Sequence, residues 1–195
     1  MAAGFARSLA LRAFSAVCPV PGSLVHEAAQ LAKRVPSQPG RVHQMGPFFD
    51  KLAHGSLSDC LPQELAAAMR GQFEWYGCRA AGFHTDAHYD AVLFGAWCLA
   101  GPDRELVFGR CGKRLPCGVG SLVIFDPFEP HAVLDPGQAR YERDRYLDAP
   151  ASLLLAFELD LLPAVRRQFG IGDAVAGCRA VSSATPVNAE TGAIG

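Results

Sequence analysis

Hydrophobic positions recur at helical spacing in the first part of the chain. Residues 22–35 carry Leu, Val and Ala three and four positions apart, after Ser23 as a candidate cap and before Pro36. Residues 58–73 repeat this pattern, with Pro62 in the first turn and an Ala-Met run that ends near a glycine. The sequence therefore predicts two amphipathic helices in its N-terminal part.

From residue 74 onward, short apolar or alternating runs are separated by Gly, Pro and Asp. The clearest run alternates strictly, and it places Leu155, Phe157 and Leu159 on one face of a strand. The predicted strand runs are residues 74–83, 91–101, 105–109, 120–126, 131–134 and 152–161. Many short strands with turn residues between them favour a sandwich or barrel. The segment LLPAVRRQFG adds a predicted closing helix.

The composition fits one well-packed domain. The chain has 195 residues, of which 50% are hydrophobic and 19% charged, so it has ample material for a core. The formal net charge is -1, and Lys and Arg are scattered, which argues against a surface for nucleic acid or for membranes. No run reaches the roughly 20 apolar residues of a membrane helix. We expect a soluble protein without nucleic-acid or membrane partners, and the sequence leaves its oligomeric state open.

Seven cysteines are present, an odd number with no CxxC pair. A disulfide framework or a zinc ribbon needs paired spacing, so we interpret the cysteines as reduced thiols of a cytoplasmic protein. The first twenty residues contain no acidic residue and in this respect look like a targeting segment, but Arg12 interrupts the apolar run that a secretory signal requires. We expect no cleaved secretory signal, and whether the N-terminus is another kind of targeting segment stays open.

The segment GFHTDAHYD, residues 82–90, concentrates candidate metal ligands in nine positions. In a strand, side chains two residues apart point the same way, so His84 and Asp86 would project side by side, about 6 to 7 Å apart at the backbone. His88 keeps the same parity but lies about 13 Å from His84 along an extended strand, so we predict that it does not bind the metal. A third ligand is expected from a distant segment, and His131 is the candidate.

His131 follows a strand run and a Pro-rich turn in GSLVIFDPFEPH, 45 positions beyond Asp86. Two histidines and one carboxylate that leave three coordination positions open are typical of non-heme Fe(II) oxygenases, whereas structural zinc sites close their shell, usually with cysteine. The HTD tripeptide and this lead-in to a distal histidine resemble the HxD…H pattern of the Fe(II)/2-oxoglutarate-dependent dioxygenase superfamily. The resemblance covers residues 74–161.

The resemblance implies an α+β, β-dominated fold: a double-stranded β-helix (jelly roll, cupin-like barrel) with N-terminal helices packed on the outside. We therefore expect an N-terminal helical segment in residues 1–73 that packs on the barrel. Residues 74–177 would form the catalytic core. Residues 178–195 are small and polar, and we expect a flexible tail there.

The resemblance also implies an activity. His84, Asp86 and His131 would bind a catalytic Fe(II), with 2-oxoglutarate and O2 as co-substrates. The expected reaction is hydroxylation of an unidentified prime substrate, a small molecule or a protein side chain, with succinate and CO2 as co-products. Tyr89 and Trp97 are expected in the core or in the pocket wall.

Members of this superfamily bind the far carboxylate of 2-oxoglutarate with a basic residue that follows the distal histidine. The stretch DPGQARYERDRY offers Arg140, nine residues after His131, and then Arg143 and Arg145. A guanidinium pairs with a carboxylate through two parallel hydrogen bonds, so we assign this role to Arg140, with Arg143 as the second candidate. The basic residue usually opens the last barrel strand, yet the predicted last strand, from Ser152, contains no Arg or Lys.

Two alternatives stay open, and the departure favours the first of them. One is a cupin-like metalloenzyme of the same architecture that does not use 2-oxoglutarate, and dependence of turnover on 2-oxoglutarate would separate it from the oxygenase. The other is a non-catalytic jelly-roll binding module, which iron content and succinate production would identify.

Overall fold

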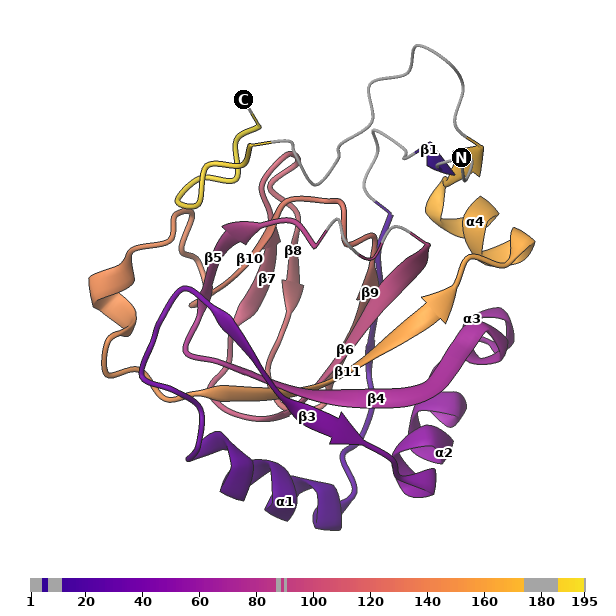
Figure 1. The fold of residues 1–195 in the computed structure, drawn as a ribbon, viewed down its shortest axis with the longest axis horizontal. Coiled ribbons are helices and arrows are strands. Elements are labelled where there is room, and N and C mark those ends of the chain that lie inside the picture. The colour runs from indigo at the N-terminus through magenta and orange to yellow at the C-terminus, as the bar shows by residue number, and fades with distance from the viewer. Residues whose placement is uncertain (1–4, 7–11, 87–88, 90, 174–185, 195) are drawn as a thin grey trace.

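Two antiparallel sheets form most of the molecule, and in the computed structural model they lie one above the other (Figure 1). The structure describes residues 5–6, 12–86, 89, 91–173 and 186–194. The fold is α+β and dominated by strands, as the sequence predicted.

The larger sheet contains six strands: β2 (Phe14–Val17), β3 (Val42–Phe48), β4 (Met69–Cys78), β6 (Val92–Ala100), β9 (Ser121–Phe125) and β11 (Ser152–Asp160). The smaller sheet contains four: β5 (Ala81–His84), β7 (Glu105–Phe108), β8 (Arg114–Pro116) and β10 (His131–Leu134). The strand orders are β2-β9-β6-β11-β4-β3 and β5-β10-β7-β8, and a separate short pair joins β1 (Phe5–Ala6) to β12 (Gly172–Asp173). From β4 to β11 the chain passes repeatedly from one sheet to the other, which is compatible with a jelly roll.

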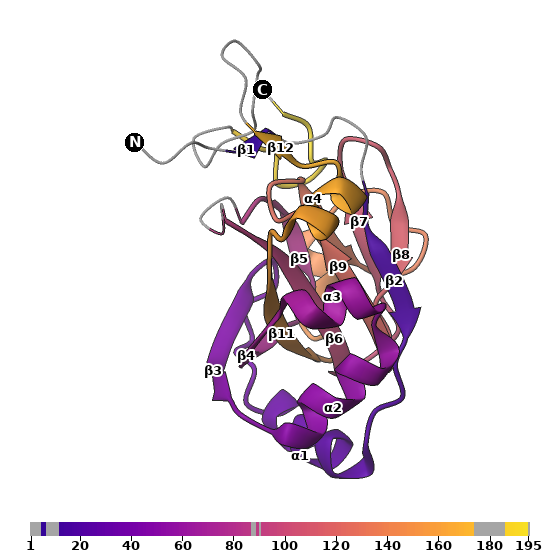
Figure 2. The same ribbon diagram turned by 90° about the vertical axis from the view of Figure 1, so that its right-hand side faces the viewer.

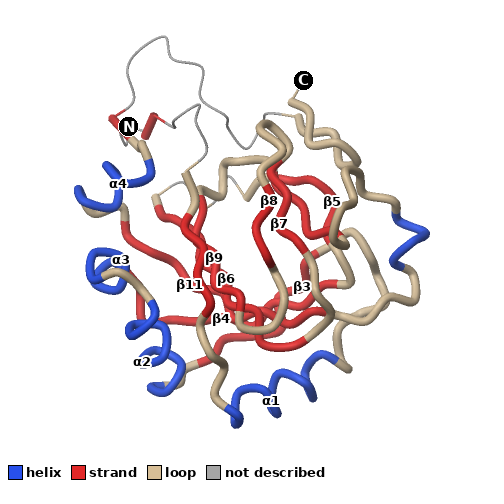
Figure 3. Tube along the Cα trace, turned by 180° about the vertical axis from the view of Figure 1, so that it is seen from behind, coloured by secondary structure: helices blue, strands red, loops and turns tan. Residues whose placement is uncertain are grey.

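Helices cover one side of the larger sheet (Figures 2 and 3). They are α1 (Gly22–Ala32), α2 (Lys51–Cys60), α3 (Gln63–Ala68) and α4 (Pro163–Phe169), and a short 3-10 helix spans Arg143–Tyr146. Helix α1 packs on β6 and β11, and α3 packs on β11. Helix α4 is the predicted closing helix, and it ends at Gly170, whose φ of 66° is a left-handed conformation that glycine adopts without strain.

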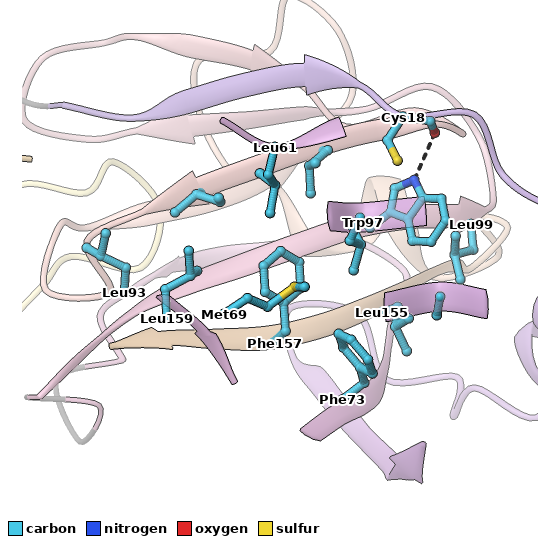
Figure 4. Close-up of a cluster of buried hydrophobic side chains, with 14 of the residues drawn as sticks. Cys18, Leu61, Met69, Phe73, Leu93, Trp97, Leu99, Leu155, Phe157 and Leu159 are labelled. Carbon is cyan, nitrogen blue, oxygen red and sulfur yellow. Dashed lines mark hydrogen bonds between the residues drawn. The ribbon is translucent and has the colours of Figure 1, made fainter. Parts of the chain in front are cut away.

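The main hydrophobic core lies between these helices and the larger sheet (Figure 4). Leu155, Phe157 and Leu159 of β11 are buried there, which confirms the face predicted from their alternation. Trp97 of β6 is also fully buried, and its indole N–H donates to the Cys18 carbonyl at 2.9 Å. The other face of the larger sheet is thereby left to face the smaller sheet.

The single helix predicted over residues 58–73 is wrong. Helix α2 ends at Cys60, α3 begins after Pro62, and the chain is already in strand β4 at Met69. Proline lacks a backbone N–H and cannot continue the first helix, so a new helix starts behind it. Residues from Met69 onward pair with β11, and this tertiary pairing overrides the helical pattern of the Ala-Met run.

Two strands of the larger sheet, β2 and β3, were not predicted from the sequence. Strand β3 is an edge strand of mixed exposure that contains Gly46 and Pro47, so its alternation is weak. The predicted helix in residues 22–35 is present as α1, but Ser23 is not its cap, because the N-cap position is Pro21. The N-terminal part therefore supplies strands as well as helices.

The end of the chain contacts the smaller sheet. Residues 178–185 of the predicted flexible tail lie outside the described residues, but residues 186–194 form a turn beside β5. The Phe83 backbone N–H donates to the Ala189 carbonyl at 2.8 Å, and that of Tyr141 donates to the Glu190 carbonyl at 3.0 Å. In the part of the chain that the structure describes, no helix has the length and apolar character needed to cross a membrane.

Candidate functional site

The structure brings His84, Asp86 and His131 together. Strands β5 and β10 are antiparallel neighbours, and His84 lies directly opposite His131 with 4.4 Å between their ring centroids. Asp86 follows β5 by two residues, and its carboxylate oxygens lie 3.8 Å from His84 Nε2 and 3.5 Å from His131 Nε2. One potential ligand atom from each of the three residues lies within 4.8 Å of the other two, so the three can share one metal ion.

Both imidazole rings are oriented by the backbone. His84 Nδ1 lies 2.8 Å from the Gly82 carbonyl oxygen, and His131 Nδ1 lies 2.8 Å from the Glu129 carbonyl oxygen. Because a carbonyl oxygen only accepts hydrogen bonds, each Nδ1 must carry the proton, which leaves the Nε2 lone pair for a metal. The Asp86 backbone N–H donates to the Pro127 carbonyl at 2.8 Å, and this contact ties the loop after β5 to the turn before β10.

Electrostatics favour a neutral His84. Burial and the neighbouring His131 ring lower the pKa of His84, while Asp86 partly opposes them. A neutral imidazole is the form that binds a metal, so less proton competition is expected at this ring.

A buried ion pair supports the turn that carries His131. Glu129 is 6% exposed, and its carboxylate accepts hydrogen bonds from Arg110 Nε at 2.9 and 3.1 Å, with Arg110 Nη2 2.8 Å away. The carbonyl of the same Glu129 accepts from His131 Nδ1. Arg110 therefore fixes the residue that in turn orients a candidate ligand.

The three residues lie in the wall of a cavity of about 430 Å³ between the two sheets. Most of its wall is apolar, with Phe94, Leu106, Val123 and Phe125 among the lining residues. Arg41 is the one arginine or lysine among the described lining residues. A cavity of this size and character suits a small molecule, with few polar groups to orient it.

Arg140 and Arg143 are not brought to this cavity. Both are exposed, and neither is a lining residue. Their neighbour Arg145 is exposed too, and its Nε donates to Asp135 at 3.1 Å. His88, which we predicted not to bind the metal, lies outside the described residues.

Arg104 is a buried cation beside the cavity wall that the sequence did not single out. Its side chain is 1% exposed, Nη2 donates to the Pro150 carbonyl at 3.1 Å, and Nε lies 3.8 Å from Asp135. Nε and Nη1 have no hydrogen-bond partner among the described residues. The Arg104 carbonyl accepts from the N–H of Cys117, a lining residue, at 2.7 Å. A hydrogen bond with Cys98 and burial raise the pKa of Cys117, and the charge of Arg104 partly opposes them.

Three further polar residues lie near the site. From the sequence, no role was predicted for Glu74 and Tyr76, and Tyr89 was expected only in the core or in the pocket wall. Tyr76 and Tyr89 line the cavity, and their hydroxyl oxygens are 3.0 Å apart. Tyr76 donates to the Glu74 carboxylate at 2.9 Å. Tyr89 lies three residues after Asp86, so its place near the metal ligands could have been anticipated, but its pairing with Tyr76 depends on the packing of the two sheets.

The three donor side chains limit which metal ions fit the site. Two imidazoles and one carboxylate, without cysteine, suit iron and related divalent ions better than a closed structural zinc site. All three donors line the cavity, so a metal ion held by them would be open to further ligands from the cavity. The arrangement can therefore hold a catalytic metal.

No family model matches the sequence, and no curated protein matches it. Solved structures that resemble the fold include a prolyl-4-hydroxylase from Pseudomonas putida, with 16% identity, a TM-score of 0.44, and coverage of 77% of this chain and 92% of that one. An oxidoreductase of the 2OG-Fe(II) oxygenase family from Burkholderia pseudomallei has 12% identity, a TM-score of 0.44, and coverage of 75% and 84%. HygX from Streptomyces hygroscopicus, with nickel and 2-oxoglutarate bound, has 12% identity, a TM-score of 0.41, and coverage of 77% and 83%.

The superfamily that the HxD…H motif predicted is represented among these structural neighbours.

Proposed function

We propose that this chain is a non-heme Fe(II) and 2-oxoglutarate-dependent oxygenase that hydroxylates its prime substrate. The observation that carries the proposal is the gathering of His84, Asp86 and His131 in the wall of an apolar cavity, with both Nε2 atoms oriented toward the carboxylate. The passage of successive strands between two antiparallel sheets supports a double-stranded β-helix with its catalytic core in residues 74–177.

The three donors fit iron, and iron bound to them would supply the oxidative decarboxylation of 2-oxoglutarate that is coupled to oxidation of the prime substrate. The chain's own contribution is to hold the donors in place before the metal arrives. His84 and His131 keep their protons on Nδ1, where backbone carbonyls accept them.

The cavity also fits an anionic co-substrate. Arg104 has two nitrogens without hydrogen-bond partners and a side chain that is almost completely buried, behind the lining residue Cys117. A buried cation with incomplete pairing is costly, and a carboxylate would complete it. Arg41 is the positive charge that lines the cavity itself. Arg104, like Arg140 and Arg143, is not itself a lining residue. It is buried behind the wall whereas the other two are exposed at the surface, so we assign the far carboxylate of 2-oxoglutarate to Arg104.

The apolar wall serves a further purpose. Phe125 packs against His131 with 4.7 Å between the ring centroids, and Phe94 packs against Phe125 at 5.9 Å. These rings limit the access of water to the candidate metal position, which strengthens electrostatic interactions there.

The test is the co-substrate dependence of turnover. Protein loaded anaerobically with Fe(II) and 2-oxoglutarate should show the weak visible absorption of a keto acid chelated to Fe(II), and exposure to O2 should release succinate. The Asp86→Ala variant should show neither. If iron-loaded, folded protein gave neither absorption nor succinate, the oxygenase proposal would be wrong.

The alternative of a cupin-like metalloenzyme that does not use 2-oxoglutarate rests on one observation. The basic residues expected after the distal histidine, Arg140 and Arg143, do not line the cavity. Metal binding through the same three residues without succinate formation would favour this alternative.

A further inference from the structure

A second hollow continues the cavity along the inner face of the larger sheet. This groove has a volume of about 260 Å³ and runs over β4 and β11. It shares five lining residues with the cavity, and these mark the junction of the two spaces: Gln44, Tyr76, Tyr89, Phe94 and Ala156. A molecule bound at the metal ligands can therefore extend into the groove without leaving the protein surface.

The chemistry of the inner face changes along the two strands. Leu154 lies beside Tyr76 and lines the apolar cavity, and one step further along the strands Ala156 lies beside Glu74. The next inward residue of β11, Glu158, lines the groove. Where the cavity is apolar, the groove therefore carries two carboxylates, Glu74 and Glu158, and one guanidinium, Arg70.

The two groove carboxylates differ in their partners. Glu158 forms an ion pair with Arg70, which also donates to Asp160 at 2.8 Å. Among the described residues, Glu74 accepts hydrogen bonds at Oε2, from Gln44 Nε2 at 2.7 Å and from Tyr76 at 2.9 Å. Within the described ranges Glu74 forms no ion pair, so its negative charge has no cationic partner there.

Three aromatic rings surround the junction next to this carboxylate. Phe94 lies 5.6 Å from Tyr89 and 6.0 Å from Tyr76, measured between ring centroids. Because the Tyr76 hydroxyl donates to Glu74, the Tyr89 hydroxyl must donate to Tyr76 at 3.0 Å, and this chain fixes both rings. Burial, together with hydrogen bonds to Tyr89 and Glu74, raises the pKa of Tyr76, so its hydroxyl stays protonated.

We propose that Tyr76, Tyr89 and Phe94 of the junction, together with the neighbouring groove residue Glu74, bind a positively charged amino or ammonium group of the prime substrate. Aromatic faces attract cations through their quadrupoles, and a carboxylate adds a direct charge interaction. Neither feature favours a neutral or anionic group. That the bound group belongs to the prime substrate rests on the proposed oxygenase function, while the cation site itself stands on the groove alone.

The distribution of charge along the cavity agrees with this assignment. Val42, next to Arg41, pairs with Cys78 at one end of β4, whereas Gln44 pairs with Tyr76 and lies nearer the groove. The positive lining residue of the cavity, Arg41, and the groove carboxylate Glu74 therefore lie toward opposite ends of one continuous space. The other positive lining residue, Arg70, is paired with Glu158 and Asp160. An anionic co-substrate and a cationic prime substrate would each meet its complementary end.

The test is direct binding to the full chain without added metal or 2-oxoglutarate. Choline and its neutral isostere 3,3-dimethylbutan-1-ol have the same shape, so calorimetric titration with each isolates the effect of charge. We expect choline to bind at least tenfold more tightly. The Glu74→Gln variant, which keeps the hydrogen-bonding shape, should reduce the difference to the part that the aromatic rings supply, whereas Glu27→Gln, the same change at an exposed residue of α1, should retain it in full.

A second pair of probes distinguishes a protein side chain from a free small molecule as the source of the positive charge. N-acetyl-lysine amide and N-acetyl-norleucine amide differ in the terminal amino group, and a larger preference for the lysine probe than for choline would indicate a protein side chain. A larger preference for choline would indicate a free small molecule. Equal binding of charged and neutral probes in both pairs, or an unchanged preference in Glu74→Gln, would overturn the proposal. Because these titrations contain no iron, a failed oxygenase assay would leave their result intact.

Discussion

His84 and His131 lie directly opposite one another on neighbouring antiparallel strands, with ring centroids 4.4 Å apart. Each ring is held by a hydrogen bond from Nδ1 to the carbonyl two residues before it. Two imidazoles at this separation, with the Asp86 carboxylate within 4 Å of both Nε2 atoms, form a site that is organised before any ion binds.

The first prediction concerns the three donors as a unit. Replacing His84, Asp86 or His131 with Ala should reduce Fe(II) affinity at least 100-fold and abolish succinate formation, because each change removes one of three donors. Anaerobic titration of Fe(II) measures this directly. His88→Ala should retain the metal. Loss of iron in His88→Ala together with its retention in His131→Ala would refute the assignment.

The second prediction concerns Arg110. Removing its guanidinium in Arg110→Gln leaves the buried Glu129 carboxylate unpaired and frees the turn that orients His131. We expect a loss of about 3 to 5 kcal/mol in unfolding free energy and a loss of about 10- to 100-fold in metal affinity.

The matched control is Arg114→Gln, which breaks the ion pair with Glu105 elsewhere in the smaller sheet. It should leave metal affinity unchanged. If both variants weakened metal binding equally at a temperature where both remain folded, Arg110 would have no specific effect on the site.

The candidate ligands could be predicted because they depend on local geometry. The period of a strand places His84 and Asp86 on one side, and the lead-in GSLVIFDPFEPH marks the distal histidine. The pairing of β5 with β10 that sets His131 opposite His84 involves residues 47 positions apart, and no local pattern specifies that register. The HxD…H motif together with its lead-in indicated that His131 joins His84 and Asp86, which the spacing along the chain alone did not.

The groove and the buried arginine could not be predicted for the same reason. Glu74 comes to lie beside Ala156 only because β4 pairs with β11, and Tyr76 meets Tyr89 only because the two sheets pack. Arg104 directly precedes a short strand, a position typical of an exposed charge, yet it is buried against the Tyr146 ring at 5.3 Å from the centroid. The prediction of a single helix over 58–73 failed because tertiary pairing outweighed local periodicity.

The third prediction is a pH dependence of stability at Glu105. Burial alone would raise the pKa of Glu105, but hydrogen bonds from Arg114 and from the Gly137 N–H lower it below its ordinary value of 4.5. A carboxyl with a lowered folded pKa contributes stability above its unfolded pKa, and this contribution is lost as the pH falls through the folded pKa. Because both side chains are partly exposed, the contribution should be about 1 kcal/mol or less.

Urea unfolding between pH 7 and pH 3 measures this contribution. Glu105→Gln should lower the unfolding free energy at pH 7 and reduce its decline on acidification, while Glu27→Gln, an exposed residue without an ion pair in the described part of the chain, should follow the wild-type profile. An unaltered profile in Glu105→Gln would show that this pair contributes nothing measurable.

The last prediction tests which arginine binds the far carboxylate of 2-oxoglutarate. Truncating a buried charge partner costs about 2 to 5 kcal/mol, so Arg104→Met should raise the 2-oxoglutarate requirement at least tenfold, which corresponds to about 1.4 kcal/mol. Iron affinity should change little, because Arg104 does not belong to the donor cluster. Arg140→Ala, at an exposed position away from the cavity lining, should keep the wild-type requirement.

Arg104→Lys separates this role from a purely structural one. The lysine keeps the charge but loses the planar fork, so it should restore folding more fully than 2-oxoglutarate binding. Apparent 2-oxoglutarate affinities from succinate release, measured beside unfolding midpoints, distinguish the two effects. A defect confined to Arg140→Ala or Arg143→Ala, with normal 2-oxoglutarate dependence in folded Arg104→Met, would return the anchor to the loop after β10, where the sequence alone had placed it.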